Sequence, residues 1–113
     1  MEKDDIYKRH ILDAIEKVER YAGGLNFEEF MKDELVRDGV VRELEIIGEA
    51  AGKVSTETRE RFPDFAWAQM IGMRNRLIHA YFDVNHDVVW KTVTEVLPPL
   101  SIKLANIIQN FNS

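Results

Sequence analysis

Apolar side chains recur at intervals of three and four residues along most of this chain, and that spacing strongly constrains its fold. Residues so spaced share one face of an α-helix, whereas no run shows the period of two that strands require. The pattern is clear over a first segment, Asp4–Tyr21, whose apolar residues are Ile6, Tyr7, Ile11, Ala14, Ile15, Val18 and Tyr21. The sequence therefore predicts an all-α fold.

Residues that cap or break helices divide this pattern into segments. Gly23–Gly24 ends the first helix, and Asn26 with Glu29 has the capping-box arrangement for a short element. The helices expected after that are Asp33–Val54, a short one from its cap Ser55 to Phe62, Ala66–Ala80 with Asp64 as cap, and Asp87–Leu97 with Asn85 as cap. Each expected connection is short, which is typical of a helical bundle.

The C-terminal part leaves one choice open. Pro98–Pro99 either starts a new helix at its first turn or kinks a continuing one, and a last apolar stripe follows it. With 113 residues, the chain fits a single domain over residues 1–113. We expect an up-and-down bundle of four to five helices.

Two glycines on the second long helix, Gly48 and Gly52, are four residues apart and share a face. Each lowers helix stability by about 1 kcal/mol relative to alanine. Two interpretations are possible: the backbone of another helix approaches this face closely, or both glycines are at the surface, where their lower helix propensity is tolerated.

Composition excludes several functional classes. The chain has no cysteine, so disulfides, thiolate metal sites and cysteine nucleophiles are ruled out. The net charge of −5 argues against non-specific coating of nucleic acid. Glu45 and Glu49, with Glu43, have a spacing that bundle metal sites use, but a solvated acidic face is favoured and no metal is expected. No leader or membrane span is recognisable, so we expect a cytoplasmic protein.

The segment from Arg74 to Tyr81 carries the side chains with chemical potential. Arginine presents a planar cationic fork that suits phosphate oxygens, and His79 is the side-chain type best suited to proton transfer near neutral pH. RNA supplies its own nucleophile, the 2′-hydroxyl. A histidine that moves the proton and an arginine that stabilises the phosphorane would suffice for cleavage without a metal.

Helix geometry complicates this pair, because Arg74 and His79 are separated by roughly 140° around a straight helix. Asn75, four residues before His79, shares its face. Either the helix ends or bends before His79, or a second copy of the chain completes the site. In a purely structural interpretation, His79 interacts with the helix C-terminus, Arg74 is solvated, and Tyr81 is an aromatic core anchor.

The string Arg74-Asn75-Arg76-Leu77-Ile78-His79-Ala80-Tyr81 resembles the Arg-x4-His-x-Tyr motif of HepT-like proteins in the HEPN superfamily. The resemblance continues over most of the chain, at Leu44–Ala51, Pro63–Trp67, Trp90 and Leu97–Pro98. One difference is Asn85-His86, where the family often has Asp-Pro, but either pair can open a helix.

This resemblance implies a HEPN bundle that forms a homodimer through its motif-bearing face. It implies a metal-independent ribonuclease toxin without a cofactor, with Arg74 and His79 as the catalytic pair and Asn75 in support. The partner would be an MNT-type nucleotidyltransferase antitoxin that transfers AMP to Tyr81. The alternative is a non-enzymatic helical subunit that binds a nucleotide or substrate for a nucleotidyltransferase.

Overall fold

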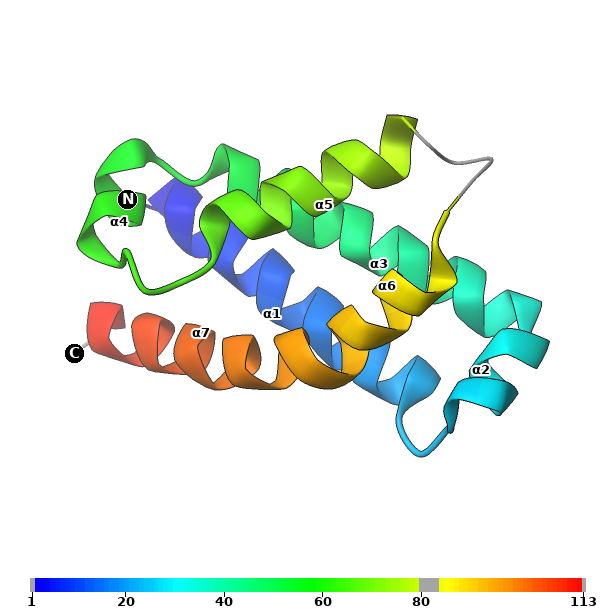
Figure 1. Ribbon diagram of the computed structural model, residues 1–113. Coiled ribbons are helices and arrows are strands. Elements are labelled where there is room, and N and C mark those ends of the chain that lie inside the picture. The colour runs from blue at the N-terminus through cyan, green and yellow to red at the C-terminus, as the bar shows by residue number, and fades with distance from the viewer. Residues whose placement is uncertain (1, 80–83, 113) are drawn as a thin grey trace.

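The computed structural model describes residues 2–79 and 84–112, and these residues form helices without any strand (Figure 1). The elements in chain order are α1 (Glu2–Ala22), α2 (Phe27–Lys32), α3 (Glu34–Lys53), α4 (Thr56–Arg61), α5 (Trp67–His79), α6 (His86–Lys91), the π-helical segment η1 (Thr92–Val96) and α7 (Leu97–Asn112). The predicted all-α fold is confirmed.

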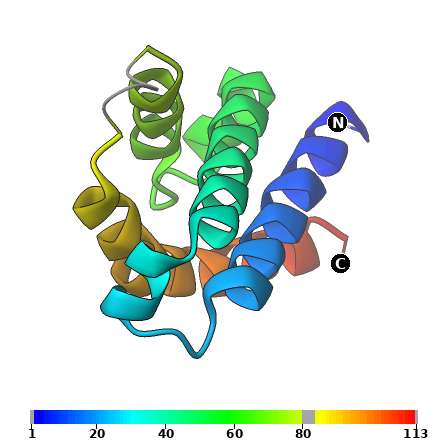
Figure 2. The ribbon, with the colours of Figure 1, turned by 90° about the vertical axis from the view of Figure 1, so that its right-hand side faces the viewer.

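Helix α3 is the central element of one layer, with α1 on one side and α5 on the other (Figure 2). The chain from α6 through η1 to α7 crosses beneath this layer, and α7 packs against α1. A core fills the space between them and consists of residues such as Ile11, Ile15, Val18, Phe30, Val40, Leu44, Ile47, Ala51, Met70, Met73, Leu97, Leu100 and Leu104. Helix α3 therefore contacts α1 along one flank and α5 along the other.

Most helix ends lie where local chemistry predicts them. Asn26 and Glu29 form the reciprocal capping box. The backbone nitrogen of Glu29 lies 2.8 Å from Asn26 Oδ1, and that of Asn26 lies 3.0 Å from Glu29 Oε1. Ser55 caps α4 by accepting the Thr58 N–H at 3.2 Å. Gly24 ends the α1 region with a φ of +85°, a value that favours glycine. These ends depend on residues close in sequence, which is why the sequence predicts them.

The expected cap at Asp64 is wrong. Helix α5 starts at Trp67, and the Met70 N–H donates to the Ala66 carbonyl at 3.1 Å, so Ala66 occupies the N-cap position. The buried rings of Phe65 and Trp67 pack with centroids 4.4 Å apart. Burial of these two rings in the core sets where the first turn begins, and Asp64 remains in the preceding loop.

The helical path continues through Pro98–Pro99 by way of a π-helical turn. The Leu97 N–H donates to the Thr92 carbonyl, five residues back, and α7 then begins with the two prolines in its first turn. Proline has no N–H to donate and clashes with the carbonyl four residues before it. The wider π-helical turn of η1, just before the two prolines, accommodates the missing N–H groups and the added bulk of the rings.

A buried carboxylate joins the start of α1 to α4. Asp4 accepts hydrogen bonds from the Ser55 N–H at 2.9 Å and from the Ser55 and Thr58 hydroxyls at 2.6 Å each. Burial raises the pKa of Asp4, but these hydrogen bonds and the nearby Lys8 charge outweigh burial, so its pKa lies below the ordinary value of 3.8. The network fixes the N-terminal end of α1.

Candidate functional site

Arg74 lies directly against α3 where Gly48 leaves room for it. A Cβ atom on Gly48 would overlap the Cβ of Arg74 and would lie 2.6 Å from the Met70 carbonyl oxygen. The close-approach interpretation is therefore confirmed at Gly48, which is buried. Gly52 is exposed, and a Cβ there would meet only the Ile71 side chain at 3.9 Å, so Gly52 is a tolerated surface glycine.

The Arg74 guanidinium is held beside Asn75. Its Nη1 donates to the Asn75 side-chain oxygen at 3.2 Å. Its Nε is buried, without a hydrogen-bond partner among the described residues. On neighbouring positions around the helix, Met73 and Leu77 are buried in the core, which fixes the rotation of α5 about its axis. The structure thus brings together two of the predicted site residues.

His79 is the final residue of α5, and the described side chains of this helix extend to Leu77. Helix α5 includes His79, so the alternative that the helix ends before this residue is wrong. The helical backbone keeps positions 74 and 79 roughly 140° apart around the axis. Tyr81, the predicted site of AMP attachment, lies outside the described residues.

Five further arginines and lysines differ in how available their side chains are for contact with RNA. Arg37 donates from Nη1 to the carbonyls of Met31 and Phe30 and so serves the end of α2. Arg42 is exposed, with its Nη1 3.5 Å from Glu45. Arg76 and Lys91 are exposed, and Lys53 pairs with Glu49 at 3.5 Å.

Carboxylates on α3 do not gather into a metal site. No cluster of three or more potential ligands occurs among the described residues. The expected solvated acidic face is wrong at Glu43, which is 7% exposed, because this position faces inward on α3. Glu49 is exposed as predicted. Within residues 2–79 and 84–112, no helix is long and apolar enough to cross a membrane.

Both tryptophans pack against the core. Trp67 is buried and donates from Nε1 to the Phe62 carbonyl at 2.9 Å. Trp90 packs on Phe30 with ring centroids 5.0 Å apart. His86 is the first residue of α6, whose cap is Asn85 as predicted.

Comparison with known proteins gives consistent matches. The family model described as "Ribonuclease HepT-like" matches residues 11–107. A protein named "Probable ribonuclease HepT" from Thermococcus cleftensis is 40% identical, over 89% of this chain and 92% of its own length. A protein of Caldanaerobacter subterraneus subsp. tengcongensis, named "Putative RNase TTE0752", is 39% identical over 91% of this chain and 92% of the relative. No solved structure matches the chain.

Proposed function

Because the chain belongs to the HepT-like ribonuclease family, we propose that it is a metal-independent endoribonuclease whose working site is built on Arg74 and His79. The observation that supports this most directly is the close packing of Arg74 against α3. A glycine at position 48 leaves room for the arginine, and Asn75 holds its guanidinium. A solvated arginine would need neither feature.

The chemistry follows from these side-chain types. His79 removes the proton from a ribose 2′-hydroxyl, and the freed oxygen attacks the adjacent phosphorus. Arg74 stabilises the negative charge that develops on the phosphorane oxygens. The bond from phosphorus to the 5′-oxygen then breaks, a protonated histidine supplies the leaving oxygen with its proton, and a 2′,3′-cyclic phosphate remains.

The active form we propose is a homodimer with the two motifs facing each other. Positions 74 and 79 are roughly 140° apart around one helix, and a second copy would let an arginine and a histidine meet at one phosphate. A two-fold axis beside α5 would place the histidine of one copy near the arginine of the other.

Regulation in this proposal acts at Tyr81. A partner nucleotidyltransferase of the MNT type transfers AMP to the tyrosine hydroxyl and so neutralises a cytoplasmic toxin. The added phosphodiester brings negative charge and bulk two residues from His79, which opposes RNA binding. The chain as a whole carries a net charge of −5, so RNA binding at this site depends on the arginines of the motif. A negative charge added beside these arginines would therefore weaken RNA binding.

The test is cleavage of single-stranded RNA in EDTA by wild-type protein, His79→Ala and Arg74→Ala, with intact mass confirming an unmodified Tyr81. We expect cyclic phosphate ends from the wild type and a loss of about 100-fold or more in each variant. Arg20→Ala, an exposed arginine in the last turn of α1, is the control. No cleavage by unmodified wild type would contradict the proposal and favour a nucleotide-binding subunit.

A further inference from the structure

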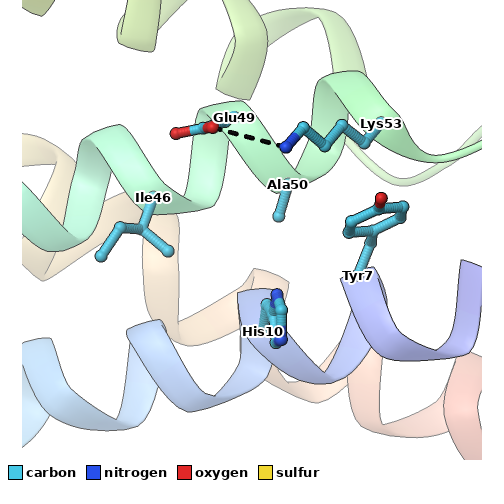
Figure 3. Close-up of a pocket in the computed structure, with 6 residues that line it drawn as sticks. All are labelled: Tyr7, His10, Ile46, Glu49, Ala50 and Lys53. Carbon is cyan, nitrogen blue, oxygen red and sulfur yellow. Dashed lines mark ion pairs between the residues drawn. The ribbon is translucent and has the colours of Figure 1, made fainter. Parts of the chain in front are cut away.

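A hollow of about 210 Å³ lies between α1 and α3. Tyr7 and His10 line it from α1, and Ile46, Glu49, Ala50 and Lys53 line it from α3 (Figure 3). We call it the α1–α3 slot. Ala50 is about 200° around α3 from Gly48, so the slot lies on the flank opposite the Arg74 contact.

The slot exists because a small side chain lies between larger ones. Ala50 is 5% exposed and lies between Ile46 and Lys53 along the same wall of α3. Opposite it, the rings of Tyr7 and His10 meet edge to face, with centroids 6.2 Å apart and planes at 76°. An apolar floor bordered by two rings results.

The polar groups at the slot fit a nucleotide. Lys53 places its Nζ 5.8 Å from the centre of the Tyr7 ring and 3.5 Å from a Glu49 carboxylate oxygen. Aromatic rings stack on bases of single strands, and a lysine ammonium attracts the phosphates between them. A carboxylate accepts hydrogen bonds from base amino groups. The volume falls below the roughly 300 Å³ of a typical small-molecule pocket, so it suits a single base.

We propose that the α1–α3 slot binds one base of the single-stranded RNA that the Arg74–His79 site cuts, and that it prefers adenine or cytosine to uracil. This inference rests on the proposed function. Gly48 and Glu49 are consecutive residues, so the two sites lie on either side of one helix of roughly 10 Å diameter. One strand crossing α3 reaches both.

Glu49 provides the discrimination. Adenine and cytosine carry an amino group on the edge where uracil carries a carbonyl oxygen. The amino group donates to the Glu49 carboxylate, whereas the carbonyl oxygen is repelled by it. Lys53 balances the carboxylate charge, so the acidic side chain does not repel the RNA backbone.

The test is binding of short fluorescein-labelled RNAs, one rich in adenine and one rich in uracil, to full-length protein carrying His79→Ala so that the RNA stays intact. Tyr7→Leu should weaken binding of the adenine-rich RNA by about 5- to 140-fold, equivalent to the 1–3 kcal/mol of one stacked base. Tyr7→Phe keeps the ring and should bind like the parent. Glu49→Gln should reduce the preference for adenine. Lys53→Gln should weaken binding of both RNAs because it removes the ammonium that attracts their phosphates, and Lys17→Gln, an exposed lysine of α1, is its control.

The outcomes separate the two proposals. If Tyr7→Leu and Glu49→Gln bind both RNAs like the parent, the slot proposal is overturned even where the wild type cleaves RNA. If the wild type does not cleave but adenine-rich RNA binds through Tyr7, the slot stands and the ribonuclease proposal falls. A change of oligomeric mass in Tyr7→Leu would show that a second copy covers the slot, which also overturns it.

Discussion

On one flank of α3, Gly48 lets α5 approach so closely that Arg74 lies against the α3 backbone, whereas on the other flank Ala50 and Tyr7 leave a hollow between α3 and α1. The closely packed flank has no room for a substituent and can hold a charged side chain in one place. The hollow flank keeps space for a flat ligand. The two sites therefore need opposite packing, and α3 provides both because Gly48 and Ala50 differ by about 200° around its axis.

The largest expected effect is on the closely packed flank. Arg74→Lys keeps the positive charge but removes the planar fork and the Nη1 that donates to Asn75. We expect RNA cleavage to fall by about 100- to 1000-fold, since one preorganised donor to the transition state contributes that much. Initial rates in EDTA measure the effect. If Arg74→Lys cleaves like the wild type, a charge without fixed geometry is sufficient and the comparison between the flanks loses its meaning for catalysis.

Gly48→Ala should have the next largest effect. The added Cβ would overlap Arg74 and press on the Met70 carbonyl oxygen, so α5 must move away from α3. Overpacking of this kind lowers the free energy of unfolding by about 1–3 kcal/mol, and cleavage should fall with it because Arg74 is displaced. Urea unfolding and cleavage rates provide the measurements. Unchanged values for both would contradict the close contact.

How far the sequence predicts these features depends on how local their causes are. The caps at Asn26 and Ser55 follow from residues three positions apart, so they were predictable. The start of α5 was not, because Phe65 and Trp67 are both buried in a core built from other helices, and this burial overrides the cap expected at Asp64. The motif containing Arg74 was recognisable by resemblance. Its support by Gly48 was one of two open interpretations, and the α1–α3 slot required the three-dimensional pairing of helices.

The α1 flank is held at its end by polar contacts, which Asp4→Ala tests. The substitution leaves the Ser55 N–H and the hydroxyls of Ser55 and Thr58 without their acceptor. Stranding buried donors should lower the free energy of unfolding by about 1–3 kcal/mol, and Asp13→Ala, an exposed aspartate of α1, should change it little. Cleavage should persist below the new unfolding midpoint. Equal stability of the two variants would show that the network does not hold α1.

Acid should weaken the same attachment. The folded-state pKa of Asp4 lies below 3.8, so the ionised carboxylate stabilises the fold above that pH. As the pH falls below 3.8 and through the folded-state pKa, this contribution is lost. Asp4→Asn should therefore show a smaller loss of unfolding free energy than the wild type over that acid range. Parallel stability curves for the two proteins would contradict the role of Asp4.

The smallest expected effect is at Gly52, the matched partner of Gly48 one helical turn away. A Cβ at position 52 makes only an ordinary contact with Ile71, and the Gly52 carbonyl keeps its hydrogen bond from Arg59 Nη2 at 2.8 Å. Gly52→Ala should therefore raise the free energy of unfolding by up to about 1 kcal/mol through helix propensity, with cleavage unchanged. If Gly48→Ala lowers the free energy of unfolding and Gly52→Ala raises it, the close contact is confined to a single turn of α3. A loss of stability in both would instead mean that α5 packs closely along the whole face, and that the seat of Arg74 is not a local feature.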